Sequence, residues 1–322
     1  MKAFGTTSDG RDVHALTLSA GDLTVTLLTY GAIVQSVRLA GVNHDLTVGS
    51  DRLADYETSM PYNGALIGPV ANRLTNAAAP IAGKPHRFEA NQDGTHALHS
   101  ASCGTQGKVW TVADHGPDHA TLTLDLPDGE GGYPGNRTIT AAFRVSAPAR
   151  LSLVLTATTD APTLFNMANH SYWNLDGAPT WVGHSLRIGA DHILPINDAT
   201  IPTGEVLDVT GTPYDFRQAR ALEPGAPALD HNFCLTGGAG PLREVLWLTG
   251  AGGVSMTLAT TEPGVQIYDG RRGVGAGLPA YAALAIEAQG WPDAPNQPHF
   301  PPVEHGPGNP YRQHTEWHFA RG

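Results

Sequence analysis

Apolar and polar residues alternate with a period of two in many short segments along the whole chain. This alternation places every second side chain on the same face of a β-strand. The clearest case is "TLTLDL" (121–126), in which three leucines face one way and three polar residues face the other. Further runs of this type lie at 23–28, 33–39, 138–145, 151–158, 254–260 and 315–319. The pattern predicts strands of antiparallel sheets.

Glycine and proline punctuate these runs from end to end. The 322 residues include 38 glycines and 25 prolines, which fits many short strands joined by tight turns. The segment "DGEGGYPGN" (128–136) is typical of a turn-rich loop. Only 50–60 has a helical pattern, with Ser50 or Asp51 as the expected N-cap. No linker or repeat divides the chain, so we expect residues 1–322 to form a single all-β domain, a large antiparallel β-sandwich.

Charge and cysteine content exclude several classes of function. The formal net charge is -11 and no basic run is interleaved with aromatic residues, which argues against a nucleic-acid partner. No apolar run has the length to span a bilayer, and the N-terminus lacks the apolar core of a signal peptide. We therefore expect a cytoplasmic protein that does not associate with membranes. Cys103 and Cys234 lie far apart without a paired motif, so two free thiols are expected.

Neither a metal nor an organic cofactor is expected. The 15 histidines include no pair or cluster with the spacing of metal ligands. The glycine-rich segment "GVGAG" (273–277) is not followed by the Lys and Ser or Thr of a phosphate-binding loop.

The stretch "FNMANHSYWNL" (165–175) combines one histidine with amides, a hydroxyl and two aromatic rings. Histidine titrates near neutral pH, amides and hydroxyls bind polyols, and aromatic faces suit the C–H faces of a sugar. His170 is therefore a candidate acid/base for a carbohydrate. Tyr172 shares its strand parity, whereas Trp173 should face the core. Alternatively, both aromatic residues belong to the core and His170 bonds a backbone carbonyl.

The segment "LAIEAQ" (284–289) carries the most informative carboxylate. In an extended strand, Glu287 and Gln289 project together on one face while Leu284 and Ile286 face the other way. Glu287 is either a base in a cleft, with Gln289 beside it, or a solvated residue on an outer face.

Three further polar residues are candidates for binding a sugar. Arg73 in "GPVANRL" offers a planar set of donors, and the alternative is a surface arginine. His96 and His99 in "HALHS" would point to opposite faces of a strand, so one of them at most is expected to act. Asp230 in "LDHNF" could bind a hydroxyl or make an Asx turn.

Taken together, these segments resemble the aldose 1-epimerases, also called galactose mutarotases. The similarity extends along nearly the whole chain, and its most specific motifs are "NHSYWNL" and "EAQGWPDAPN". The resemblance implies a β-supersandwich with an open cleft, no metal or organic cofactor, and a monosaccharide aldose as substrate. A monomer or a homodimer is expected.

The resemblance also assigns roles to the candidate residues. Glu287 matches the general base and His170 the general acid of the family, while His99, Arg73 and Asp230 match residues that position the sugar. Gln289 and Tyr172 are expected to contribute to sugar binding. The chain departs from the family at Pro69, which replaces an arginine, at Ser100, which follows "LH" where glycine is usual, and at Trp291. These departures affect the expected sugar preference.

Two other functions compete with this one. A glycoside hydrolase or lyase would use Glu287 with Asp230 or Glu304 as a carboxylate pair. A non-catalytic sugar-binding module would keep the cleft without turnover. For the epimerase, we expect a bell-shaped pH profile of kcat/KM, with an acid limb that follows a carboxylate and an alkaline limb that follows a histidine.

Overall fold

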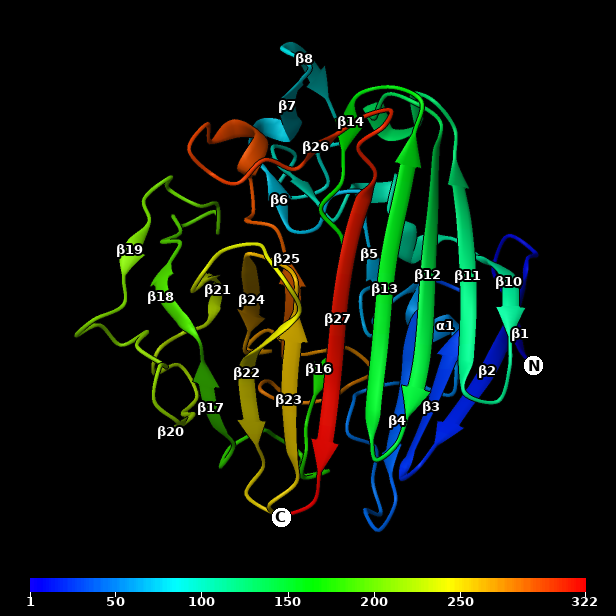
Figure 1. Cartoon of the computed structure of the whole chain (residues 1–322), viewed down its shortest axis with the longest axis vertical. Coiled ribbons are helices and arrows are strands. Elements are labelled where there is room, and N and C mark those ends of the chain that lie inside the picture. Colours follow the sequence, from blue (N-terminus) through cyan, green and yellow to red (C-terminus); the bar gives the residue numbers. More distant parts are fainter.

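The computed structural model describes residues 1–322 and confirms an all-β architecture (Figure 1). The chain forms 27 strands, one α-helix of five residues and five single-turn 3-10 helices. Every strand pairing within the sheets is antiparallel, as the alternating sequence pattern predicts. The helices therefore contribute little to the core.

The largest sheet has nine strands and runs across the front of the molecule in Figure 1. Its spatial order is β10 (Thr111–His115), β11 (His119–Leu126), β12 (Arg137–Ser146), β13 (Arg150–Thr159), β27 (Tyr311–Ala320), β23 (Ser255–Thr260), β22 (Arg243–Thr249), β17 (Ser185–Ile188) and β20 (Arg220–Ala221). The C-terminal strand β27 thus lies in the middle of the sheet, between β13 and β23. It joins the two halves of the chain.

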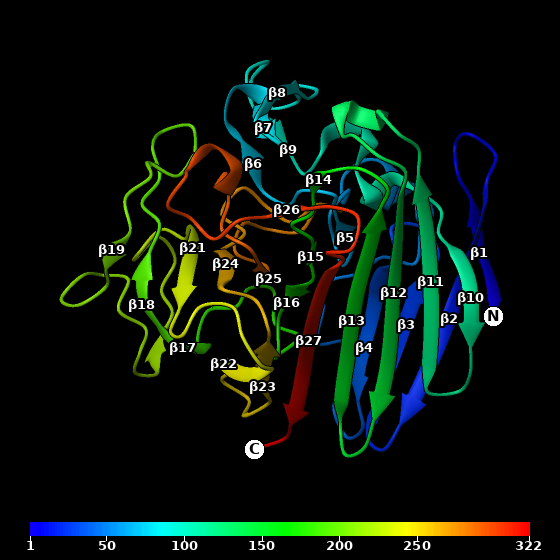
Figure 2. The ribbon, with the colours of Figure 1, turned by 45° about the horizontal axis from the view of Figure 1, so that its top comes forward.

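Two smaller sheets pack behind this one. The first contains β1 (Lys2–Thr6), β2 (Asp12–Ala20), β3 (Leu23–Leu28) and β4 (Ile33–Leu39). The second contains, in spatial order, β16 (Tyr172–Trp173), β25 (Leu284–Gln289), β24 (Gly264–Tyr268), β21 (Asp230–Leu235), β18 (Ala190–Ile193) and β19 (Leu207–Asp208). Figures 1 and 2 show the four-stranded sheet behind β10–β13 and the six-stranded sheet behind β22, β23 and β27.

The core lies between these layers. One cluster of 54 buried apolar residues includes Val25 of β3, Phe143 of β12 and Ile286 of β25, so both smaller sheets share it with the large one. Trp173 of β16 packs 6.2 Å from Trp317 of β27, measured between ring centroids. Trp173 therefore faces the core, as its strand parity predicts.

Short elements complete the fold. Pairs of short strands are β5 (Leu66–Ile67) with β15 (Ala168–Asn169), β6 (Arg73–Leu74) with β9 (Ala97–Leu98), β7 (Ala78–Ile81) with β8 (Lys84–Arg87), and β14 (Thr163–Leu164) with β26 (Glu304–His305). The 3-10 helices are η1 (Thr75–Ala77), η2 (Ala101–Cys103), η3 (Thr105–Gly107), η4 (Glu130–Gly132) and η5 (Ala294–Asn296).

The predicted helix at 50–60 is shorter than expected. α1 spans Leu53–Glu57, its N-cap is Arg52, and no side chain caps it. The predicted cap at Ser50 or Asp51 is therefore wrong. Ser50 lies outside the helix, where its hydroxyl donates to the carboxylate of Asp55 at 2.5 Å and accepts from the backbone N–H of Arg52 at 3.1 Å.

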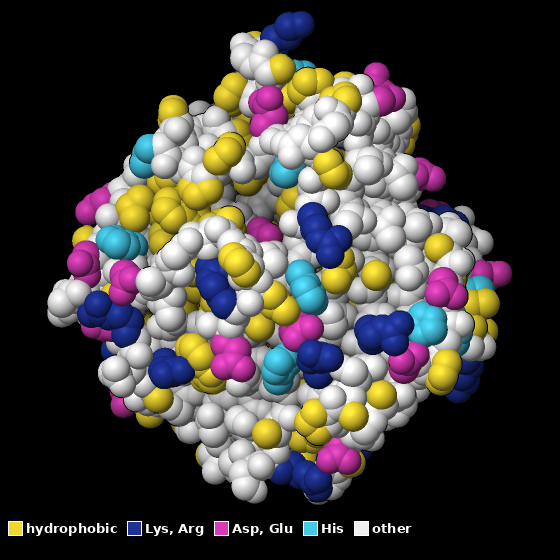
Figure 3. Space-filling view, in the orientation of Figure 1, with side chains coloured by type: hydrophobic (Ala, Val, Ile, Leu, Met, Phe, Trp, Pro, Cys, Tyr) yellow, Lys and Arg dark blue, Asp and Glu magenta, His cyan; other side chains and the backbone are white.

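The predicted strands match the structure closely. The runs at 23–28 and 33–39 coincide with β3 and β4, and 284–289 coincides with β25. None of the helices has the length and apolarity needed to cross a membrane. On the face drawn in Figure 3, Lys and Arg side chains are scattered among acidic side chains and histidines rather than gathered into one basic patch.

Candidate active site

A cavity of about 460 Å³ lies at the six-stranded sheet. Six of the seven candidate residues named from the sequence line it: Arg73, His99, His170, Tyr172, Asp230 and Glu287. Four of them lie on the strands β6, β16, β21 and β25. The two histidines lie in turns, His99 directly after β9 and His170 shortly before β16. Segments that lie far apart in the sequence therefore meet in one place.

Strand pairing brings His170 and Glu287 together. Tyr172 of β16 pairs with Ala285 of β25 in antiparallel register. Continuing that register by two residues aligns His170 with Glu287, on the same face of the sheet. The side chains accordingly meet, with Nε2 of His170 3.4 Å from Oε1 of Glu287.

Glu287 is buried at the centre of β25, with a relative exposure of 2%. It is therefore not the solvated residue that an outer face would hold. Its Oε2 has no hydrogen-bond partner in the protein. Burial, and secondarily the negative charge of Asp230, raise the pKa of Glu287 well above its usual value, while the positive charge of Arg73 opposes this. Burial therefore favours the neutral, protonated form of this carboxyl.

His170 is also buried, and its Nδ1 has no hydrogen-bond partner. The alternative role, a structural histidine bonded to a backbone carbonyl, is therefore not what the structure shows. Burial lowers the pKa of His170 from its ordinary 6.5 to about 4. For a pair that holds one proton, burial therefore favours the arrangement in which Glu287 carries it and the imidazole is neutral.

His99 differs from His170 in its hydrogen bonding. Its Nδ1 accepts the backbone N–H of Asn72 at 3.1 Å, so the proton of the neutral ring resides on Nε2. Burial, with contributions from His170 and Arg73, lowers the pKa of His99 well below its ordinary value. His99 is thus a neutral hydrogen-bond donor. His96 lies outside the cavity, where its Nδ1 accepts the backbone N–H of Asn76 at 3.1 Å.

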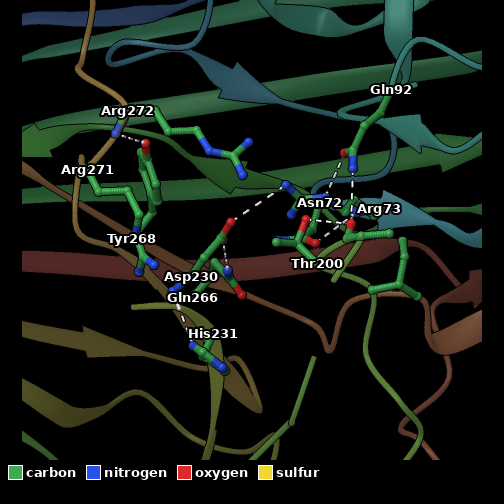
Figure 4. Close-up of polar contacts among 12 residues, drawn as sticks. Asn72, Arg73, Gln92, Thr200, Asp230, His231, Gln266, Tyr268, Arg271 and Arg272 are labelled. Carbon is green, nitrogen blue, oxygen red and sulfur yellow. Dashed lines mark hydrogen bonds and ion pairs between the residues drawn. The ribbon is translucent and has the colours of Figure 1, made fainter. Parts of the chain in front are cut away.

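Asp230 and Arg73 form an ion pair on another wall of the cavity (Figure 4). The separation of NH2 of Arg73 from Oδ2 of Asp230 is 3.6 Å. Gln266 donates from Nε2 to Oδ1 of Asp230 at 2.8 Å, and Nε of Arg73 donates to Gln92 at 2.7 Å. Arg73 is therefore not a free surface residue, and Asp230 does not form an Asx turn with its own backbone.

Aromatic side chains surround the two histidines. The ring of Tyr62 lies 4.7 Å from that of His99 and 5.8 Å from that of His170, centroid to centroid. Tyr172 lies 5.0 Å from His170. These rings exclude water from the imidazoles, which is the physical cause of their lowered pKa values.

Gln289 is the one candidate that the structure does not bring into the cavity. It is fully buried, and its Nε2 donates to the backbone carbonyl of Gly290 at 3.1 Å. Strand parity correctly aligns Gln289 with Glu287, but Gln289 is the last residue of β25 and lies beyond the lining of the cavity. The expected contact with the sugar is therefore not supported at this position.

Glu304 and the two cysteines also lie outside the cavity. Glu304 is exposed and accepts the backbone N–H of Ala82 at 2.8 Å, so it cannot form a carboxylate pair with Glu287. Both cysteines are free. Burial raises the pKa of Cys103 and raises that of Cys234 to about 12, which makes either thiol a poor nucleophile. No cluster of three or more His, Cys, Asp or Glu side chains is arranged to hold a metal ion.

Several lining residues were not named from the sequence. They include Tyr62, Asn72, Tyr268 and Arg272. Gln266, which anchors Asp230, was also missed. The signal for Gln266 was available: "GVQIY" is an alternating run, and it pairs with β25 so that Gln266 lies opposite Glu287. Nothing in the local pattern distinguished Tyr62 from a core tyrosine.

The three departures from the family pattern do not line the cavity either. Ser100 has a positive φ of 59°, and its hydroxyl accepts from Val70 N–H at 2.9 Å and donates to the Val70 carbonyl at 3.1 Å. Trp291 packs against Phe300 and donates to the carbonyl of Pro263 at 3.1 Å. Pro69 is buried. None of the three therefore belongs to the lining of the cavity.

Comparison with known proteins shows the family of the chain. The family model for aldose 1-epimerase matches residues 14–318. The chain belongs to the aldose 1-epimerase family. It is 34% identical to the galactose mutarotase of Bos taurus, over 95% of this chain and 93% of the relative. It is 31% identical to the aldose 1-epimerase of Escherichia coli, over 97% and 96% respectively.

Solved structures of the family have the same fold. An aldose epimerase homologue from C. elegans is 29% identical and superimposes with a TM-score of 0.90, covering 96% of this chain and 99% of that one. A galactose 1-epimerase from Lactobacillus acidophilus is 25% identical with a TM-score of 0.86, covering 99% and 98%. The galactose mutarotase-like β-supersandwich expected from the sequence is thereby confirmed.

Proposed function

We propose that this epimerase interconverts the α and β anomers of a free aldose with Glu287 and His170 as its two proton carriers. The observation that supports this most strongly is their contact. Nε2 of His170 and Oε1 of Glu287 lie 3.4 Å apart in a cavity lined by further hydrogen-bonding side chains. A carboxyl and an imidazole that share one proton form a natural acid/base pair.

The reaction needs one proton removed and one delivered. Glu287, as the base, removes the proton from the hydroxyl on C1, while His170, as the acid, protonates the ring oxygen. The bond between C1 and the ring oxygen then breaks, and the open aldehyde rotates about the C1–C2 bond. Ring closure on the other face reverses both transfers, so each residue ends in its initial state.

The protonation state of the resting pair fits this cycle. Burial of both groups favours the arrangement with the single proton on Glu287. Passing that proton to His170 gives the ion pair required for ring opening, with no exchange with solvent. The enzyme should therefore work while the pair holds one proton and should lose activity when the pair gains a second proton or loses the first.

The remaining residues are suited to hold the sugar. The protonated Nε2 of His99 is a donor for a sugar oxygen, and Arg73 and Asp230 present a donor and an acceptor side by side. Tyr172 offers an apolar ring face next to His170. Relatives named galactose mutarotase support D-galactose as one substrate.

Polarimetry tests the proposal directly. Freshly dissolved α-D-glucose and α-D-galactose should reach rotational equilibrium faster with the protein present, whereas an aryl glycoside should not be cleaved. The Glu287→Gln variant should lose about 100-fold to 10,000-fold in rate, the usual effect of removing a general base. Sugar binding without acceleration would indicate a binding module, and cleavage of the aryl glycoside would indicate a hydrolase.

We also propose that the whole chain acts as a single domain in the cytoplasm. In support, β27 from the C-terminus pairs with β13 on one side and β23 on the other. Both cysteines remain unpaired, as is usual in a reducing compartment.

A further inference from the structure

A second cavity of about 290 Å³ adjoins the first. The two cavities share three lining residues, Asp230, Tyr268 and Arg272. The second one continues past them to Tyr214 and His231, whose rings pack 4.8 Å apart, and to Arg271. A substrate bound against Glu287 and His170 therefore has space for a substituent in the second cavity.

Arg272 lies at the junction of the two cavities with a free side chain. Its backbone N–H donates to the hydroxyl of Tyr268 at 3.0 Å, but its guanidinium makes no hydrogen bond or ion pair within the protein. Arg271, in contrast, is occupied by two bonds to Asp269, each of 2.9 Å. Of the arginines at this site, Arg272 alone has all its side-chain donors available.

The charge around the junction favours an anion. The arginines there are Arg73, Arg271 and Arg272, and the acidic side chains paired with two of them are Asp230 and Asp269. Asp230 is paired with Arg73 and Asp269 with Arg271, which leaves the guanidinium of Arg272 without an acidic partner, although the whole chain has a net charge of -11. Burial raises the pKa values of both Asp230 and Tyr268, and the charge of Arg272 opposes both shifts, so it acts across this junction.

We propose that Arg272 binds an anionic substituent, a phosphate or a carboxylate, on an aldose whose anomeric carbon lies against the contacting side chains of Glu287 and His170. The planar guanidinium offers paired N–H donors that match the oxygens of either group. This inference rests on the proposed epimerase function and extends its substrate class to acidic aldoses. Arg272 would act in recognition only, without taking part in proton transfer.

The rate of anomer exchange, measured at equilibrium by NMR saturation transfer, tests the inference. The substrates are D-glucose, D-glucuronate and D-glucose 6-phosphate, each corrected for its uncatalysed exchange. The wild-type protein should have a higher kcat/KM for at least one acidic sugar than for glucose. Arg272→Gln should reduce that preference about tenfold, the typical effect of losing a charge-assisted hydrogen bond, and Arg272→Lys should restore part of it.

Arg312→Gln is the matched control, because Arg312 is an exposed arginine on β27 that lines neither cavity. It should leave the preference unchanged. Preference for glucuronate alone or for the phosphate alone would support the inference and identify the group. Acceleration of glucose without any preference for an acidic sugar, or equal losses in Arg272→Gln for all three substrates, would overturn it. If no sugar were accelerated, the proposed epimerase function itself would fail.

Discussion

Replacing His170 by asparagine in a Glu287→Gln background should reveal the cost of burying the imidazole. The amide introduced by Glu287→Gln copies the neutral carboxyl of the resting site, so only one titrating group separates the Glu287→Gln and Glu287→Gln/His170→Asn proteins. Burial lowers the pKa of His170 from 6.5 to about 4. Because the folded pKa lies below the unfolded one, the contribution of neutral His170 to stability is complete above pH 6.5 and is lost as the pH falls toward 4.

The size of this effect follows from the two pKa values. Between about pH 7.5 and about pH 5, the single variant should lose about 2 kcal/mol more unfolding free energy than the double variant, since each pH step below 6.5 costs up to about 1.36 kcal/mol. Urea unfolding followed by far-ultraviolet circular dichroism at several pH values measures this difference. Curves that stay parallel across the range would show that the imidazole is not buried in its neutral form and would refute the assignment.

Further predictions concern the pH profile, the charges beside Glu287, the turn after His99 and metals. The profile of kcat/KM should be bell-shaped with its acid limb set by His170 and its alkaline limb by Glu287, so loss of the acid limb in His170→Asn would be the decisive observation. Asp230 raises the pKa of Glu287, so Asp230→Asn should move the alkaline limb to lower pH. Arg73 lowers the same pKa, so Arg73→Gln should move that limb to higher pH, and shifts of equal sign in the two variants would contradict this. Ser100→Gly relieves a positive φ but removes three buried hydrogen bonds, so denaturation should show a net loss of about 1 kcal/mol, and a gain would show that strain dominates. EDTA should leave the rate unchanged, a prediction that rescue of a chelated sample by one metal ion would exclude.

The assignment of the pH limbs reverses what the sequence suggested. Ordinary pKa values place a carboxylate on the acid limb and a histidine on the alkaline limb. The structure buries both groups, and burial disfavours the charged form of each, which raises the pKa of Glu287 and lowers that of His170. Sequence patterns identified both residues but could not give their desolvation, which depends on rings such as that of Tyr62 from distant segments.

The positions of the strands, and the face of the sheet on which each side chain lies, were largely predictable because both depend on the local alternation of apolar and polar residues. Glu287 and Trp173 both point where strand parity places them. Register between strands was not predictable in the same way. The meeting of His170 with Glu287 depends on the pairing of β16 with β25, and no local signal in the long stretch of chain between these two strands specifies that pairing.

The position of Gln289, outside the lining of the cavity, shows the limit of parity arguments. Strand parity states which face of a sheet a side chain occupies, but it does not state how far along that face a cavity extends. Glu287 lies opposite Gln266, in the middle of β24, whereas Gln289 lies opposite Gly264 at its beginning. There Trp291 covers the end of the strand, and its indole bonds the carbonyl of Pro263. Position along the strand, rather than facing, therefore decides which of the two side chains can reach a sugar.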